Sequence, residues 1–134
     1  VPGHRVLLPR ARDAREALPE AIRTLGGTID VVEAYRTEAP QGPATATLAR
    51  RLKAGEIDSV TFTSSSTVTN FLALVANHGG AALLDGVAVA CIGPITAETA
   101  RAVGLAPAVI AKTYTIEGLV DALIEHFAPP EGSR

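Results

Sequence analysis

Apolar and polar positions along the chain follow a pattern typical of strands that alternate with helices. Short runs rich in β-branched and apolar residues indicate buried strands at residues 5–9, 29–35, 59–62, 87–92 and 108–111. Each run precedes a segment with helical periodicity, and these segments cover residues 13–25, 44–54, about 66–75, 95–102 and 116–127. Pro19 lies inside the first segment and argues against one continuous helix there.

This alternation predicts an α/β fold with a mostly parallel five-stranded sheet and helices on both faces. Residues 37–43, TEAPQGP, are rich in proline and glycine and indicate a turn or linker. In open sheets of this kind, ligands bind beyond the carboxyl ends of the strands. Candidate functional residues are therefore sought at those ends.

The stretch TFTSSSTVTNF, residues 61–71, places three consecutive serines between a strand and a helix. Ser64, Ser65 and Ser66 thus occupy a turn in which several backbone N–H groups lack intrahelical partners. Free N–H groups and hydroxyls together can hold an anion. The simpler interpretation, that one serine only caps the helix, remains open.

Other strand ends share this polar, mostly uncharged character. Arg10 and Arg12, with Arg15 nearby, follow the first strand. Helix starts that add the positive end of a helix dipole are expected at residues 64–66, 94–96 and 115. This surface suits a ligand with several carboxylates or phosphates, and ordinary helix caps are the alternative.

Composition excludes several classes of function. The net charge of −2 provides no basic field for nucleic acid, and no apolar run reaches the length of a membrane span. Hydrophobic residues make up 47% of the 134 residues and aromatic residues only 4%, which suits helices on a buried parallel sheet. The single cysteine, Cys91, cannot form an internal disulfide and fits a reducing compartment, so a cytoplasmic location is expected.

Several well-known catalytic patterns are missing. The serine run lacks the glycines of a nucleophile elbow, and His78 would lie about 18 Å along the helix from Ser66. The sequence contains neither a phosphate loop nor a dinucleotide fingerprint. Its three histidines and one cysteine show no metal-ligand spacing, so no metal is expected.

Four segments, in this order, resemble uroporphyrinogen-III synthase. VLLPRARDAREALPEAIRTLGGTIDVVEAYRT is similar to the family's mid-chain strand-helix-strand segment. VTFTSSSTVTNFL resembles its T-F-T-S-P-S-x-V turn, VACIGPITAETARAVGL its I-G-P-x-T-A segment, and YTIEGLVDAL its closing helix. The resemblance runs from about Arg5 to Phe127.

The resemblance implies a lyase of tetrapyrrole and heme biosynthesis with two flavodoxin-like lobes and a cleft between them. Its substrate is hydroxymethylbilane, a linear tetrapyrrole with eight carboxylates. The enzyme closes this chain into uroporphyrinogen III while inverting ring D, and it uses neither a cofactor nor a metal. No nucleic-acid or membrane partner is implied.

The resemblance also suggests site residues. Tyr35 matches the tyrosine of a V-Y-x-T motif and is the candidate proton donor to the leaving hydroxyl. Ser65 stands where the family often has proline, and Ala11 where it has glycine. The expected substrate-binding residues are Arg10, Thr63, Ser64, Ser65, Ser66, Gly93, Pro94, Thr96 and Thr115.

The chain has about half the length that the family requires. Residues 1–38 are expected to belong to one lobe and residues 39–134 to form the bulk of the other. One copy could fold as a single domain, or two copies could form a homodimer that swaps residues 1–38. A non-catalytic module that senses tetrapyrroles or other polyacids within a larger regulatory protein is the main alternative, and a binding domain for a small sugar or phosphate is a weaker one.

Overall fold

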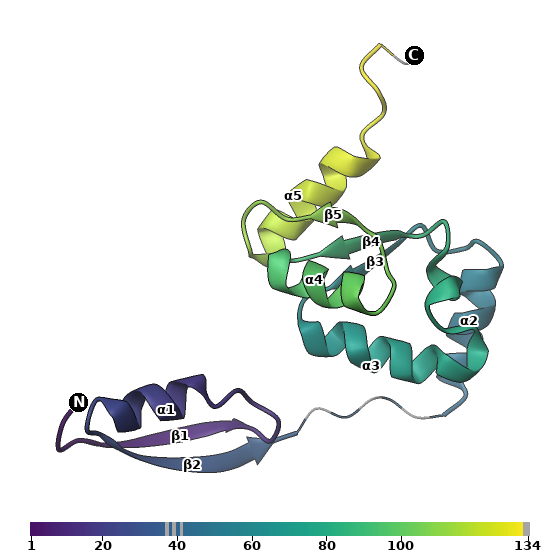
Figure 1. Cartoon of the computed structure of the whole chain (residues 1–134). Helices are drawn as coiled ribbons and strands as arrows, with labels where there is room; N and C mark the ends of the chain where they lie inside the picture. Colours follow the sequence, from purple (N-terminus) through teal and green to yellow (C-terminus); the bar gives the residue numbers. More distant parts are fainter. Residues whose placement is uncertain (37, 39, 41, 133–134) are drawn as a thin grey trace. The chain divides into compact units, whose positions relative to one another are not determined.

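The structure is a computed structural model that describes all residues except 37, 39, 41, 133 and 134. It divides into two compact units, Val1–Glu38 and Ala39–Arg134, called unit 1 and unit 2 below (Figure 1). Thr37, Ala39 and Gln41 of the predicted linker lie outside the described residues.

Unit 1 consists of two parallel strands joined by a helix. Its elements are β1 (Arg5–Ala11), α1 (Ala17–Thr24) and β2 (Thr28–Tyr35). The helix begins later than predicted, at Ala17, so that Pro19 falls in its first turn. Backbone N–H groups in the first turn have no intrahelical acceptor, so the N–H that proline lacks costs no hydrogen bond there. Pro19 is buried against the sheet.

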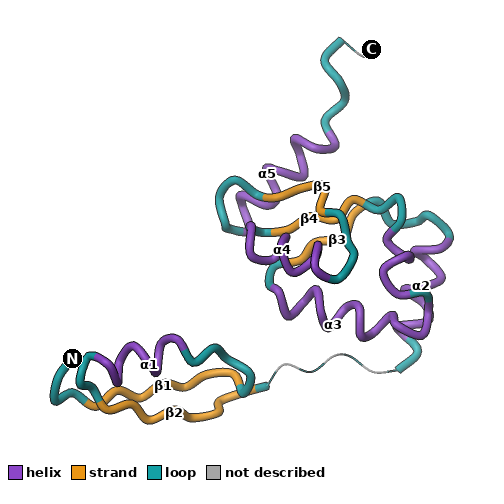
Figure 2. The backbone as a smooth tube through the Cα atoms, viewed as in Figure 1, coloured by secondary structure: helices purple, strands orange, loops and turns teal. Residues whose placement is uncertain are grey.

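Unit 2 contains a three-stranded parallel sheet with the order β3-β4-β5 (Figure 2). Its strands are β3 (Ser59–Phe62), β4 (Ala88–Cys91) and β5 (Pro107–Ile110). Four α-helices surround them: α2 (Ala44–Lys53), α3 (Ser65–Val75), α4 (Pro94–Ala102) and α5 (Ile116–Phe127). Two short 3₁₀ helices, Ala76–His78 and Gly80–Leu84, were not predicted.

The core of unit 2 lies on both faces of this sheet. On one face, Phe62, Val89 and Cys91 pack with buried residues of α2, α3 and α4, such as Val68 and Val75. On the other face, a smaller cluster joins α5 to the strands and comprises Ala90, Val109, Ala111 and Leu119. Aliphatic and alanine side chains dominate both clusters, as the composition predicts.

The α/β fold with parallel strands is confirmed, and the predicted bounds of β3 and α5 match the structure. One feature differs from the expectation. The five strands form a two-stranded and a three-stranded sheet instead of one continuous sheet. In the described part of the chain, β1, β2, β3 and β5 each pair on one side only, so both sheets have open edges.

None of the described helices is both long enough and apolar enough to cross a membrane.

Replacing Phe62 tests the core of unit 2. Its ring is only 2% exposed and contacts Phe71 edge to face, with 5.7 Å between ring centroids. We expect Phe62→Ala to lower the free energy of unfolding by about 3–5 kcal/mol, because it leaves a cavity. Urea unfolding followed by circular dichroism measures this change. Glu98→Ala on the exposed surface of α4 is the control and should change stability by less than about 0.5 kcal/mol; equal effects would contradict the assigned core.

Candidate functional site

The carboxyl ends of the three strands in unit 2 meet at one edge, because the strands are parallel. Helices α3, α4 and α5 all start at this edge (Figure 1). Eight of the nine residues expected to bind substrate lie here. They are Thr63, Ser64, Ser65, Ser66, Gly93, Pro94, Thr96 and Thr115.

Ser64 caps α3. Its hydroxyl oxygen accepts a hydrogen bond from the Thr67 N–H at 3.2 Å, and the Thr67 hydroxyl oxygen accepts one from the Ser64 N–H at 3.2 Å. This capping box satisfies two groups that the turn would otherwise leave unpaired. The cap interpretation of the serine run is therefore confirmed for Ser64, and its hydroxyl is already engaged.

Ser65 joins the starts of two helices. The Thr99 hydroxyl of α4 donates a hydrogen bond to the Ser65 oxygen at 2.7 Å, so the first turn of α3 is tied to α4. Ser66 is exposed, and its hydroxyl lies 3.1 Å from that of Ser64. Sequence reasoning missed Thr99, because nothing in a helix-surface threonine indicates a partner 34 residues away.

The start of α4 is formed by backbone rather than by side chains. Gly93 is its N-cap in an extended conformation, and Pro94 occupies the first turn. Thr96 is only 5% exposed, and its N–H lies in the first turn of α4, where the N-cap Gly93 offers no side-chain acceptor. A Cβ on Gly93 would lie 3.3 Å from the Tyr114 ring. Sequence reasoning also missed Tyr114, which is 65% exposed beside this turn.

Thr115 caps α5, and its hydroxyl oxygen accepts a hydrogen bond from the Gly118 N–H at 3.0 Å. Thr63 is exposed directly after β3. The edge therefore combines engaged capping hydroxyls with first-turn N–H groups and the positive ends of three helix dipoles.

Arg10 and Tyr35 belong to unit 1. The Arg10 guanidinium donates to the Arg15 carbonyl at 3.1 Å and forms an ion pair with Glu16. The hydrogen bond that Arg10 donates to the Glu16 carboxylate lowers the pKa of that carboxyl. Tyr35 ends β2 with its side chain 62% exposed, and its carbonyl accepts the Arg12 N–H at 2.9 Å. Arg10 thus holds the loop after β1, and the Tyr35 side chain is accessible.

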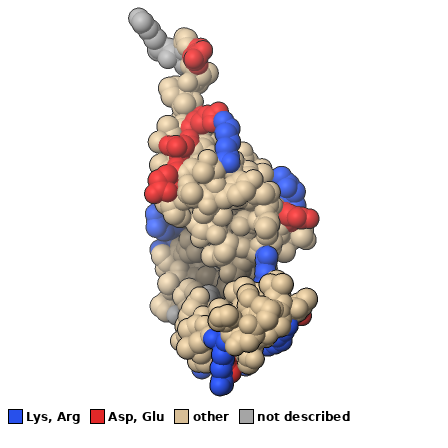
Figure 3. All heavy atoms as spheres, turned by 90° about the vertical axis from the view of Figure 1, so that its left-hand side faces the viewer, with Lys and Arg blue, Asp and Glu red and all other residues tan. Residues whose placement is uncertain are grey.

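The electrostatic potential at this edge of unit 2 comes mainly from the positive ends of the α3, α4 and α5 dipoles and less from charged side chains. Figure 3 looks toward this side and shows uncharged surface at its centre, with charged side chains around the border. Within the residues that the structure describes, no group of three or more His, Cys, Asp or Glu could hold a metal ion. The arrangement can bind anionic groups and offers no nucleophile with an adjacent base.

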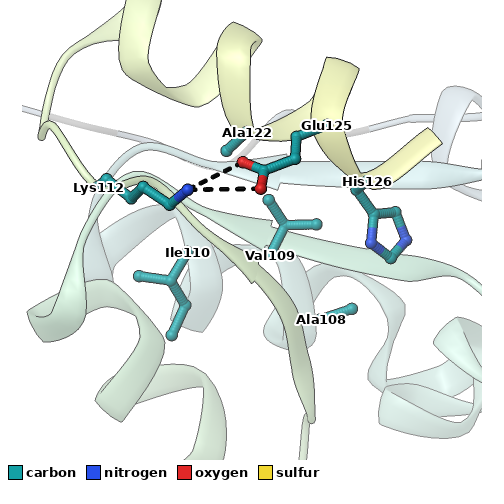
Figure 4. Close-up of a pocket in the computed structure, with 7 residues that line it drawn as sticks. All are labelled: Ala108, Val109, Ile110, Lys112, Ala122, Glu125 and His126. Atoms are coloured by element: carbon teal, nitrogen blue, oxygen red, sulfur yellow. Dashed lines mark hydrogen bonds and ion pairs between the residues drawn. The ribbon is translucent and has the colours of Figure 1, made fainter. Parts of the chain in front are cut away.

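The hollow in Figure 4 lies elsewhere, between β5 and α5. Its volume is about 250 Å³, and the ion pair between Lys112 and Glu125, with 3.0 Å from Nζ to Oε2, closes one side. None of the residues expected to bind substrate lines this hollow. It is therefore not the candidate site.

Comparison with known proteins gives one consistent family. Residues 1–121 match the model of the family described as uroporphyrinogen-III synthase HemD. The chain is 37% identical over 128 residues to a uroporphyrinogen-III synthase of Synechococcus elongatus, covering 92% of this chain and 48% of that protein. It is 38% identical over 127 residues to a protein of Methanothermobacter thermautotrophicus provisionally assigned the same activity, covering 92% and 49%.

A solved structure has the same fold. The uroporphyrinogen-III synthetase of Helicobacter pylori superposes with a TM-score of 0.70 at 19% identity, over 91% of this chain and 53% of that one. The chain spans about half the length of the curated relatives that it matches.

Removing the capping hydroxyl of Ser64 tests the geometry of the edge. We expect Ser64→Ala to lower the free energy of unfolding by about 1 kcal/mol, because the Thr67 N–H loses its acceptor. Ser66→Ala is the matched control and should change stability by less than about 0.5 kcal/mol. Denaturant unfolding of both variants measures this difference, and an equal loss in both would contradict the assignment of Ser64 as the cap.

Proposed function

This chain belongs to the uroporphyrinogen-III synthase family, and we propose that it supplies the C-terminal half of such a synthase. The proposed substrate is hydroxymethylbilane. Its terminal hydroxyl leaves as water, ring D inverts through a spiro intermediate, and the ring closes as uroporphyrinogen III. The proposed reaction needs neither a cofactor nor a metal.

The observation that supports this proposal is the meeting of three helix starts at one edge of unit 2. First-turn N–H groups of α3, α4 and α5 remain available there, because the capping side chains satisfy only some of them. A substrate with eight carboxylates carries the charge that such dipole ends favour. The Thr99–Ser65 hydrogen bond holds two of these starts in a fixed relation.

Each predicted site residue then has a specific role in the proposal. Ser65, Ser66 and Thr96 contribute mainly backbone N–H groups, and Thr63 a hydroxyl, while Ser64, Gly93, Pro94 and Thr115 shape the helix starts. Tyr35 gives a proton to the leaving hydroxyl, for which its exposed side chain is suited. Arg10 remains in the substrate-binding set, with Glu16 competing for its guanidinium.

We also propose a cytoplasmic location, which the single buried cysteine supports. A homodimer in which residues 1–38 of one copy complete residues 39–134 of another would provide two lobes, as the family requires. The alternative of a regulatory sensor module has no support among the matched relatives, whose names refer to porphyrin biosynthesis.

The isomer composition of the product tests the proposed activity. Hydroxymethylbilane closes without an enzyme to the type I isomer. We would incubate it with this chain, oxidise the product and separate the porphyrin isomers. Type III isomer above the enzyme-free blank is expected. Type I isomer alone, from protein shown to be folded by circular dichroism, would contradict the activity of this chain.

The same assay tests Tyr35. We expect Tyr35→Phe to lower the rate of type III formation by roughly tenfold or more, since it removes the proton donor. Glu98→Ala on the exposed surface of α4 is the control, because Glu98 is not among the proposed site residues, and it should remain close to the unaltered chain. Equal rates for the two variants would remove Tyr35 from its proposed role.

A further inference from the structure

The ladder between β1 and β2 contains one register shift. Residues 5–10 of β1 pair one to one with residues 28–33 of β2. The next residue of β1, Ala11, pairs with Tyr35, so Ala34 is passed over. β2 therefore has one residue more than β1 at this point. This is a β-bulge, and bulges are rare in parallel pairs.

The hydrogen bonds of the ladder show the same shift. At its start the Thr28 N–H donates to the His4 carbonyl. A one-to-one register that begins there would direct the Arg12 N–H to the carbonyl of Ala34. The Arg12 N–H instead donates to the Tyr35 carbonyl at 2.9 Å. The extra residue of β2 is therefore Ala34.

The two faces of this sheet differ in their cover. Val6 and Leu8 of β1 are half-buried, whereas Leu7 between them is 64% exposed. Successive strand residues point to opposite faces, so α1, which lies along the two strands (Figure 1), covers the face of the even-numbered residues of β1. The Arg10 side chain belongs to this face, because it pairs with Glu16 directly before α1.

Strict alternation would place Tyr35 on the covered face. Residues paired across a ladder share a face, so Val31 and Glu33 of β2 lie on the face of Leu8 and Arg10. Tyr35 comes two residues after Glu33. In a strand without a bulge its side chain would point the same way, to the side that α1 covers.

The bulge reverses this direction. Ala11 lies on the face of Leu7 and Pro9, and its partner Tyr35 points to that face as well. The Tyr35 side chain is 62% exposed, which agrees with a position on the face that α1 leaves uncovered. One extra residue in β2 thus directs the phenol away from α1.

The loop after β1 holds the bulge in place. The Arg10 side chain donates to the Arg15 carbonyl at 3.1 Å and pairs with Glu16, so it closes the loop that contains Arg12. The same loop supplies the Arg12 N–H that the Tyr35 carbonyl accepts. Arg10 is therefore connected to the orientation of Tyr35 through the backbone of this loop.

We infer that Ala34 is a positioning residue for Tyr35, because the extra residue directs the phenol to the exposed face of unit 1. This inference rests on the proposed role of Tyr35, which gives a proton to the leaving hydroxyl. A proton donor must come within hydrogen-bond reach of the atom that it protonates. On the opposite face, α1 and the loop after β1 would separate the phenol from a substrate as large as a tetrapyrrole.

The effect comes from the number of residues in β2 and not from the side chain of residue 34. Ala34 is exposed and carries only a methyl group. Among the described non-glycine residues none has a positive φ, so residue 34 needs no special backbone conformation. Removing or balancing the extra residue should therefore turn Tyr35, and replacing the side chain should not.

Fluorescence quenching of Tyr35 tests its orientation directly. The chain has two tyrosines and no tryptophan, so Tyr35 is the only remaining tyrosine in a Tyr114→Phe background. Deletion of Ala34 in this background removes the bulge. We expect a loss of quenching by acrylamide, because the phenol turns to the side that α1 covers.

A second variant removes the bulge from the other strand. One alanine inserted between Arg10 and Ala11 gives β1 a partner for Ala34, so the pairing becomes one to one and Tyr35 turns to the α1 side. The same loss of quenching is expected. Ala34→Ser keeps the number of residues and is the matched control, in which quenching should not change. Circular dichroism shows which variants remain folded.

Kinetics test whether the extra residue acts through Tyr35. Deletion of Ala34 should lower the rate of type III isomer formation by roughly tenfold or more, as expected for Tyr35→Phe. Combining the two changes should add no further loss, since both remove the same proton donor. Losses that add would indicate a general structural defect and would overturn the positioning role.

The quenching result does not depend on the proposed activity. Quenching of Tyr35 that is unchanged in either folded variant without the bulge would overturn the inference, even if the unaltered chain forms the type III isomer. Lost quenching would support the orienting role of Ala34, even if the unaltered chain yields only the type I isomer and thereby contradicts the proposed synthase.

Discussion

Parallel strands must be covered on both faces and paired along their edges, and this constraint governs the whole chain. Its five strands separate into sheets of two and three, so each unit has an open edge and bare apolar side chains. The outer backbone groups of the edge strands β1 and β3 are left to water, and Leu7 in unit 1 is 64% exposed.

The candidate site follows from the same sheet. Because β3, β4 and β5 are parallel, three helix starts meet at one edge without any cluster of charged residues. Capping by Ser64 and Thr115 fixes two of these starts, and the Thr99–Ser65 hydrogen bond aligns α3 with α4. Such a surface can bind anions through the fixed dipoles of its helices. This agrees with the proposed substrate, which carries many carboxylates, and with a proposed reaction that needs no strong nucleophile from the protein.

Local sequence signals predicted most of the elements, and non-local contacts account for what they missed. β3 and α5 were placed correctly because an apolar run and an amphipathic stretch are each bounded by threonine or serine. α1 starts later than the predicted residue 13, and Pro19 lies in its first turn. The partners of Arg10 and Ser65, Glu16 and Thr99, depend on how loops and helices pack, and no local sequence signal indicates them. The split of the sheet also escaped prediction, because alternating strands do not show which edges pair.

Hydrogen exchange of individual backbone amides tests the proposed homodimer most directly. The Leu7 and Thr61 N–H groups face the open edges, whereas the Ala88 N–H is bonded to the Asp58 carbonyl within unit 2 and serves as the protected reference. NMR-detected exchange should show protection of Leu7 and Thr61 that increases with protein concentration as copies pair. Exchange of both amides at the rate of unpaired groups, at concentrations where Ala88 is protected, would contradict a homodimer that swaps residues 1–38.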